Sequence, residues 1–272
     1  MKRILLIALI AATLPCRFVL ADGTETASQE LKALVTKVRA DIKAGKTTEA
    51  ALSDDLQQFD ALLAEHKGEK TDAVAGILYM KAILYSEVIH DTAKGDALIN
   101  QLTNDFSGTT FVANLEKQNA QEATAKKIQA GLAEGTQFPD FNEKDVMGKS
   151  LSIANYKGKV VMIDFWATWC PPCRGEIPNV VATYQKYHDK GFEIIGVSLD
   201  SDQQKLLDFT KANNMTWRQY FDGQGWSNKL AVKYGIESIP MTFLLDGNGK
   251  VIGKGLRGEE LTDAVATALG SK

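Results

Sequence analysis

Residues 160–174 read VVMIDFWATWCPPCR, an apolar run that leads into two cysteines separated by two prolines. The apolar run predicts a buried strand, and the spacing of Cys170 and Cys173 matches one turn of a helix that begins after it. Two thiols at this spacing, where a strand gives way to a helix, can open and close a disulfide reversibly. The stretch therefore indicates redox chemistry at the end of a buried strand.

The first residues have the layout of a secretory signal. Lys2 and Arg3 precede an apolar core over residues 4–14, and residues 19–21 offer small side chains for cleavage before Asp22. The core is too short to cross a bilayer as a helix, which needs about 20 residues. We expect a signal peptide over residues 1–21 and a periplasmic or otherwise exported protein. An uncleaved membrane anchor and a buried N-terminal helix are the alternatives.

The cysteine count fits this expectation. The only other cysteine is Cys16, which lies in the segment expected to be removed, so the exported chain would keep Cys170 and Cys173 alone. Thiols do not stay reduced by default outside the cytosol. Two cysteines are too few for a disulfide framework or a four-cysteine zinc site. We expect no metal and no cofactor; a stable disulfide or a partial metal site is the alternative for the pair.

Length and charge limit the possible functions. The chain has 272 residues, enough for two modest domains, with 44% hydrophobic and 24% charged residues, as in ordinary globular proteins. The formal net charge is −3, and removal of the three basic residues of the signal segment leaves −6. Nucleic acid is not an expected partner, because phosphate binding requires an excess of Lys and Arg.

Residues 22–134 read as an all-α helical domain. Apolar residues recur at helical spacing, Thr26 with Gln29 forms a candidate capping box, and Thr71 is a candidate helix cap. No proline occurs between Pro15 and Pro139, which favours uninterrupted helices. The pattern predicts a small helical bundle without a clean 34-residue repeat. The expected helices cover residues 31–42, 52–63, 74–88, 97–102 and 111–132.

Residues 135–272 alternate strand-sized apolar runs with helices. Asp246-Gly247-Asn248-Gly249 is a strong hairpin turn signal near the end. This order predicts an α/β fold with helices on both faces of a central sheet. The expected strands cover residues 151–153, 160–166, 192–199, 217–221, 241–245 and 250–254, and the expected helices cover 177–190, 206–213, 226–234 and 261–269. The three histidines, His66, His90 and His188, lie on separate predicted helices and read as surface residues.

The two cysteines are expected to have different roles. A thiolate is the nucleophile, and a helix N-terminus offers free N–H groups and the positive end of the helix dipole to the sulfur of Cys170. Cys170 would attack a partner disulfide, and Cys173, deeper in the helix, would resolve the mixed disulfide. Pro171 and Pro172 donate no N–H to the thiolate, which favours a reducing couple. Asp164, on the buried strand, is expected to have a raised pKa and to accept a proton.

The motif resembles the thioredoxin superfamily, and more narrowly its exported TlpA- and ResA-like thiol–disulfide oxidoreductases. The resemblance covers about residues 136–272 and rests on these segments: Asp164-Phe165-Trp166-Ala167, Trp169-Cys170-Pro171-Pro172-Cys173, and Ile239-Pro240 before a hairpin. The helical half matches no family that we can name. The resemblance implies a thioredoxin fold, with a central mixed sheet flanked by helices, preceded by the all-α domain.

The resemblance also implies roles for single residues. Asp164 would be the buried acid that assists deprotonation of Cys173, and Glu176 would be the acid of the ResA-like branch. Pro240 would be a cis-proline facing the disulfide. The substrate groove would be formed by Trp169, Pro171, Pro172, Ile239 and Pro240. Trp166 reads as a core residue.

The sequence therefore predicts an exported thiol–disulfide oxidoreductase that reduces protein disulfides through Cys170 and Cys173. Protein thiols or disulfides would be its substrates, with apocytochrome thiols as one candidate by resemblance. A membrane thiol carrier would supply electrons. The alternatives are a disulfide-forming oxidase and a partner-binding protein in which the helical domain dominates. The direction of electron flow and the oligomeric state stay open.

Overall fold

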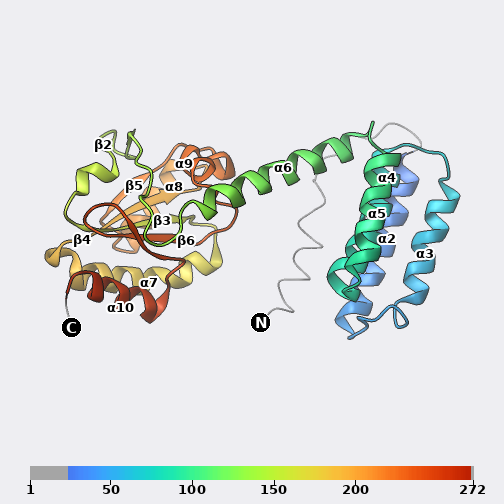
Figure 1. Ribbon diagram of the computed structural model, residues 1–272, viewed down its shortest axis with the longest axis horizontal. Helices are drawn as coiled ribbons and strands as arrows, with labels where there is room; N and C mark the ends of the chain where they lie inside the picture. Colours follow the sequence, from blue (N-terminus) through green and yellow to red (C-terminus); the bar gives the residue numbers. More distant parts are fainter. Residues whose placement is uncertain (1–23, 271–272) are drawn as a thin grey trace. The chain divides into compact units, whose positions relative to one another are not determined.

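The computed structural model describes residues 24–270, so the expected signal segment lies outside the described residues. Contacts divide the chain into two compact units that meet between Asn119 and Ala120 (Figure 1). Each unit encloses its own cluster of buried apolar side chains. Among the described residues, no helix is long and apolar enough to cross a membrane.

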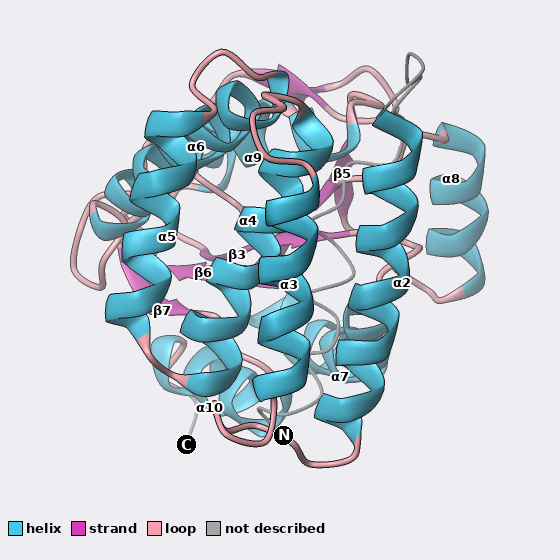
Figure 2. Cartoon of the chain, turned by 90° about the vertical axis from the view of Figure 1, so that its right-hand side faces the viewer, coloured by secondary structure: helices cyan, strands magenta, loops and turns pink. Residues whose placement is uncertain are grey.

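The first unit is helical, as predicted. Its central helix, α4, is buried along most of its length and packs against α2, α3 and α5 (Figure 2). The elements are α2 (Thr24–Lys43), α3 (Ser53–Glu65), α4 (Asp72–Ile83), the π-helical segment η1 (Leu84–Ile89), α5 (Thr92–Asp105) and the first half of α6 (Thr110–Ala130). The Thr71 side chain accepts a hydrogen bond from the Val74 N–H and caps α4, as expected. The capping box expected at Thr26 is wrong, because α2 already begins at Thr24.

His66 is buried, which corrects its expected surface position. It follows the last residue of α3 and is 7% exposed. Its ring nitrogens lie 3.0 Å from Glu30 Oε2 and 3.1 Å from Glu69 Oε1. Hydrogen bonds to both carboxylates raise the pKa of His66 above its ordinary value, against the opposing effect of burial. No sequence pattern indicated Glu30 as a partner, because Glu30 lies on α2, whereas Glu69 is three residues from His66 in the chain.

The second unit holds a five-stranded mixed sheet in the order β5-β4-β3-β6-β7. β3, β4 and β5 are parallel, whereas β6 is antiparallel to both β3 and β7. The strands are β3 (Val160–Trp166), β4 (Phe192–Ser198), β5 (Arg218–Tyr220), β6 (Met241–Leu245) and β7 (Val251–Lys254), and a separate pair is formed by β1 (Glu143–Lys144) and β2 (Ser150–Leu151). The predicted central strand and the terminal hairpin are confirmed, whereas β1 was not expected.

Helices cover both faces of this sheet. α7 and α10 pack together on one face, while α8 and α9 lie on the other (Figure 1). They are α7 (Pro171–Tyr187), α8 (Gln203–Ala212), α9 (Lys229–Lys233) and α10 (Gly258–Ala268), with short 3-10 turns η2 (Ile153–Tyr156), η3 (His188–Lys190) and η4 (Gly225–Ser227). The helix expected over 226–234 is thus split into η4 and α9. The predicted thioredoxin fold, a mixed sheet flanked by helices after a helical region, is confirmed.

α6 spans the boundary between the two units. In its second half, Gln129 donates a hydrogen bond to the Tyr234 carbonyl, and its own carbonyl accepts one from Lys254 Nζ at 3.3 Å. Ile128 packs against the core of the sheet unit, and Leu132, just beyond the helix, is buried in it. The sequence places the boundary at residue 134, whereas these contacts join residues 120–134 to the sheet unit.

The topology brings three chain segments to one edge of the sheet. β3 and β4 are parallel, so their carboxyl ends lie together, and β6 begins there because Met241 pairs with Phe165. Ligands of open α/β sheets bind at the carboxyl ends of the strands. The Cys170 motif, which follows β3, and the Ile239-Pro240 pair, which precedes β6, therefore meet at this edge.

Candidate active site

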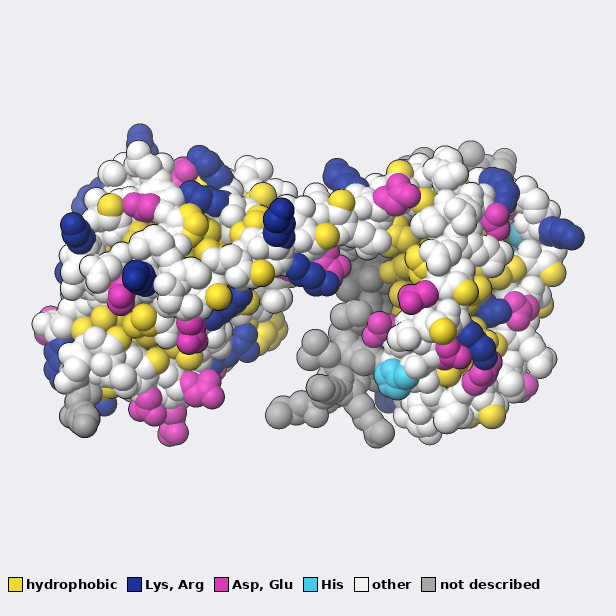
Figure 3. Space-filling model, in the orientation of Figure 1, with side chains coloured by type: hydrophobic (Ala, Val, Ile, Leu, Met, Phe, Trp, Pro, Cys, Tyr) yellow, Lys and Arg dark blue, Asp and Glu magenta, His cyan; other side chains and the backbone are white. Residues whose placement is uncertain are grey.

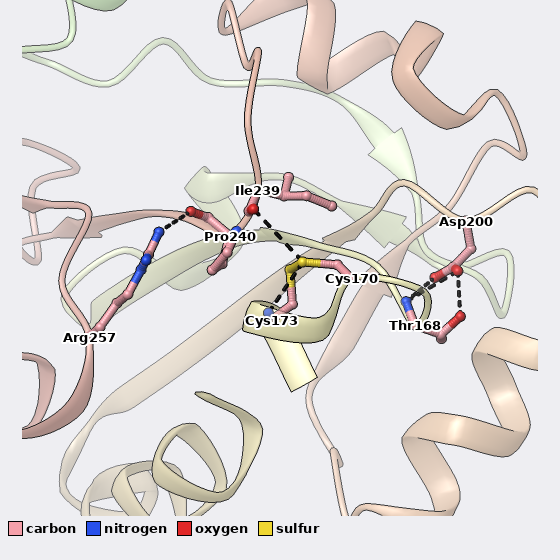
Figure 4. Close-up of a disulfide and its surroundings, with 7 residues drawn as sticks. All are labelled: Thr168, Cys170, Cys173, Asp200, Ile239, Pro240 and Arg257. Atoms are coloured by element: carbon pink, nitrogen blue, oxygen red, sulfur yellow. Dashed lines mark hydrogen bonds between the residues drawn. A yellow bond between two sulfur atoms is a disulfide. The ribbon is translucent and has the colours of Figure 1, made fainter. Parts of the chain in front are cut away.

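Cys170 and Cys173 are joined by a disulfide at the start of α7 (Figure 4). Cys170 is the N-cap residue, and Pro171 takes the first helical position, where a missing N–H costs nothing. The Cys173 N–H lies 3.2 Å from the Cys170 sulfur and donates to it. Each cysteine is only 3% exposed. The first sulfur thus occupies the place of a capping oxygen, where the free N–H of the helix stabilises a thiolate.

The Ile239–Pro240 peptide bond is cis, as the resemblance implies. The Ile239 carbonyl oxygen lies 3.8 Å from the Cys170 sulfur, and the reduced thiol can donate to it (Figure 4). Ile239 and Met241 are half-buried beside the pair. The expected groove residues Pro171 and Pro172 are exposed at the start of α7. The structure thus brings the Ile239 carbonyl, which precedes the cis-proline, to the sulfur of Cys170.

Asp164 and Glu176 face one small cavity behind Cys173. The cavity has a volume of about 20 Å³, room for one water molecule, and its lining includes Cys173, Asp164, Glu176 and Arg257. Burial raises the pKa of Asp164 to about 7; the nearby Glu176 carboxylate raises it too, whereas the Arg257 guanidinium lowers it. Asp164 can therefore exchange a proton near neutral pH. Glu176 also accepts a hydrogen bond from the Gly258 N–H at 3.0 Å.

A buried polar network holds the loop that leads to Cys170. Asp200 accepts hydrogen bonds from the Thr168 N–H and, at 2.6 Å, from the Thr168 hydroxyl (Figure 4). It also accepts one from the Ser198 hydroxyl at 2.7 Å. Sequence reasoning missed Asp200, although an acidic residue directly after a buried strand was a usable signal. The network fixes the approach of the chain to the disulfide.

Trp169, which precedes Cys170 in the chain, packs against a second exposed tryptophan, Trp226. Trp169 and Trp226 are 51% and 48% exposed, and their ring centroids are 6.1 Å apart. The loop of Trp226 is fixed by Asn228, whose amide donates to the Ser198 carbonyl at 3.2 Å and to Asp222 at 3.1 Å. Trp226 was missed, because it lies far from the motif in the sequence. Trp166 is buried in the core, as expected.

Charged side chains of both signs lie on the face of each unit that Figure 3 shows. On the face shown in Figure 3, Lys and Arg side chains are interspersed with Asp and Glu side chains over each unit. Across residues 24–270, no group of three or more His, Cys, Asp or Glu side chains is arranged to hold a metal ion. The ionisable and redox groups that the structure places together at this site are the two sulfurs and the carboxyl groups of Asp164 and Glu176.

Known proteins match the sheet unit. Residues 133–269, half of the chain, match the family model described as Redoxin. The thiol-disulfide oxidoreductase ResA of Bacillus thuringiensis is 35% identical over 126 residues, which cover 46% of this chain and 70% of the relative. The thioredoxin-like protein YneN of Bacillus subtilis is 33% identical over 131 residues, covering 47% and 74%.

A solved structure also aligns with this part of the chain. The thioredoxin domain of a thiol-disulfide oxidoreductase from Bacteroides vulgatus is 33% identical, with a TM-score of 0.47. The alignment covers 51% of this chain and 99% of that domain.

Proposed function

The chain belongs to the redoxin family of the thioredoxin superfamily and is a ResA-like thiol–disulfide oxidoreductase, and we propose that it reduces protein disulfides outside the cytosol. Cys170 and Cys173 are the reacting residues of this proposal. The observation that carries it is the position of Cys170 as the N-cap of α7, with its sulfur beside the Ile239 carbonyl. The N-terminal layout of residues 1–21 supports export.

The reaction begins from the reduced pair. The Cys170 thiolate attacks one sulfur of a partner disulfide, so that a mixed disulfide forms and the other partner sulfur leaves as a thiolate, which takes up a proton. Cys173 then loses its proton and attacks the Cys170 sulfur, which releases the second partner thiolate. Two electrons pass to the partner, and Cys170–Cys173 becomes the disulfide. A dithiol carrier, which we place in the membrane, would reduce the pair again.

Asp164 is the proposed proton acceptor for Cys173. Both residues line the cavity behind the disulfide. A carboxyl group whose pKa is raised to about 7 is well matched to proton transfer at neutral pH. Glu176 faces the same cavity, and its negative charge raises the pKa of Asp164 further. We therefore assign Glu176 the role of tuning the pKa of Asp164.

The reducing direction is supported by the residues that surround the Cys170 sulfur. Pro171 and Pro172 carry no N–H, so the Cys173 N–H is the helix donor that reaches this sulfur among the described residues. A couple becomes more oxidising when its reduced form is strongly stabilised, as in strong disulfide oxidants. A thiolate with few N–H donors therefore favours a reductant over a disulfide-forming oxidase.

The substrate segment would lie beside Ile239, which is half-buried and precedes the buried cis-proline. The cis-proline has no N–H, and its carbonyl accepts from Arg257, so the backbone of Ile239 is the group that would pair with an extended chain next to the partner cysteine. The packed and exposed rings of Trp169 and Trp226 would add an apolar surface at the residue that precedes Cys170. Protein disulfides in extended segments fit such a surface.

A trapping experiment tests this function in the full chain. Cys173→Ala keeps the nucleophile but cannot resolve the mixed disulfide, so substrates should accumulate as covalent adducts that a reductant releases. Cys170→Ala is the matched control and should trap nothing. Equal adducts in both variants, or none in either, would contradict the proposed roles of the cysteines.

A further inference from the structure

The turn between β7 and α10 is hydrogen-bonded to the strand that follows the cis-proline and to the helix that carries the cysteines. Gly255 N–H donates to the Thr242 carbonyl at 2.8 Å, and the Thr242 hydroxyl donates to the Leu256 carbonyl at 3.1 Å. On the other side, Asn179 Nδ2 donates to the Gly258 carbonyl at 2.9 Å. The turn is therefore fixed to β6, which begins after Pro240, and to α7, which carries the cysteines.

Arg257 extends from this turn toward the cis-proline (Figure 4). Its Nη2 donates to the Pro240 carbonyl at 2.8 Å. Pro240 directly follows Ile239, whose own carbonyl lies 3.8 Å from the Cys170 sulfur. The guanidinium thus restrains the carbonyl of Pro240, and the carbonyl of the preceding residue, Ile239, is the one that faces the sulfur.

The same side chain lines the cavity behind the disulfide. The titratable groups that face Asp164 there are Cys173 and Glu176 from α7 and Arg257 from the turn before α10. The sheet neighbours of Asp164 in register are Gly196 on β4 and Thr242 on β6, neither of which titrates. Arg257 is accordingly the cation that offsets two carboxylates in this lining.

From these two contacts we propose that Arg257 is a positioning residue for disulfide exchange, which fixes the cis-proline edge against Cys170 and sets the charge balance of the Asp164–Glu176 pair. This inference rests on the proposed function of the cysteines. It assigns two separable effects to one side chain: a hydrogen bond to Pro240 and a positive charge near Asp164.

Two substitutions separate the effects. Arg257→Gln removes the positive charge that stabilises the ionised form of Asp164. The pH at which the exchange rate is half-maximal should therefore rise by about half a unit or more. Loss of the bond to Pro240 should also slow exchange roughly 3- to 10-fold at every pH. Arg257→Lys keeps the charge, and it should retain the wild-type midpoint while remaining slower.

The measurement is the rate at which the reduced full-length protein reduces oxidised glutathione between pH 5 and pH 9. Carbon-13 NMR of the Asp164 carboxyl gives the same titration without relying on exchange. Arg218→Gln is the matched control, because Arg218 bonds to Asp145 and the Lys149 carbonyl and does not line the cavity. It should leave both readouts unchanged.

The outcomes distinguish this inference from the proposed function. If the wild-type protein reduces no disulfide at any pH, the proposed function fails. If the wild type exchanges and Arg257→Gln matches it in rate and in the Asp164 titration, the inference alone is overturned. A slower rate with an unchanged titration in Arg257→Gln overturns the charge effect.

Discussion

Asp164 combines a central position in a buried strand with a side chain that ionises near neutral pH. It is 7% exposed, and its carboxylate faces Glu176 across the small cavity. The sequence predicted a raised pKa from burial alone. The contribution of Glu176 depends on the way α7 crosses the strand, which no local pattern reveals.

We expect Asp164→Asn to change how stability depends on pH. The pKa of Asp164 is about 7 in the folded protein against an ordinary 3.8. Between these values the folded protein keeps a proton that the unfolded chain has released, so wild-type stability falls as the pH rises. The asparagine variant lacks this loss, and its unfolding free energy should gain on the wild type by on the order of 4 kcal/mol from pH 4 to pH 8. Denaturant unfolding of both proteins at pH 4 and at pH 8 provides the check. The account is wrong if the difference in unfolding free energy between the two proteins is the same at both pH values.

Trp226 provides a second prediction for a single residue. It packs against Trp169, and aromatic pairs of this kind contribute about 0.5–1.5 kcal/mol beyond their buried area. Trp226→Ala should slow the reduction of a protein disulfide roughly 3- to 10-fold and leave the reduction of oxidised glutathione nearly unchanged. Stopped-flow rates with both substrates test this. An equal loss for both would assign Trp226 to folding and not to docking.

At the scale of secondary structure, patterns in the sequence predicted the helices and strands better than they predicted the contacts between them. β3 and the hairpin were predicted because apolar runs and the Asp-Gly-Asn-Gly turn are local signals. α7 begins at Pro171, since proline fits the first helical position, and the spacing of the cysteines predicted this start, whereas the apolar periodicity marked a helix only from residue 177. Asp200, Trp226 and Arg257 were missed, because the fold brings each of them to a partner far away in the sequence: Thr168, Trp169 and Pro240.

His66 links α3 to α2 through Glu30, and this link is expected to depend on pH. Its raised pKa means that the stabilisation is complete below the ordinary value of 6.5 and is lost as the pH rises through the folded value. His66→Gln should therefore destabilise the helical unit more at pH 5.5 than at pH 9. Helix content during denaturant unfolding is the measurement.

His90 offers a matched control for this experiment. Its side chain is exposed and makes no hydrogen bond or ion pair among the described residues, and its backbone N–H donates to the Tyr85 carbonyl. His90→Gln should leave the pH dependence of helix stability as it is in the wild type. A pH dependence that is the same in all three proteins would remove His66 from this role.

On the scale of the whole molecule, the two units have separate cores, and the sheet unit includes the second half of α6. We expect a chain of residues 120–272 to fold and to keep its rate with oxidised glutathione. A chain of residues 135–272 loses Leu132, which is buried in the sheet core, and the Gln129 contact with Tyr234. Its unfolding free energy should be lower by about 2–4 kcal/mol. Equal stabilities of the two fragments would place the boundary at residue 134.

The fragment of residues 120–272 also tests whether the helical unit takes part in catalysis or only recruits the partner. If residues 120–272 reduce a small disulfide at the full-length rate but lose a cellular substrate in the Cys173→Ala trap, the helical unit recruits the partner. Loss of the reaction with oxidised glutathione would instead show that the helical unit takes part in the chemistry.

The reduction potential of the Cys170–Cys173 couple tests the central claim most directly. The full-length protein is equilibrated in dithiol–disulfide buffers of stepped potential, and the fraction of free thiols is measured after acid quenching and alkylation. The account predicts a single two-electron transition at a potential more negative than about −200 mV, in the range of reductants such as thioredoxin near about −270 mV. A transition near about −120 mV, where strong disulfide oxidants lie, or no transition at all, would contradict it.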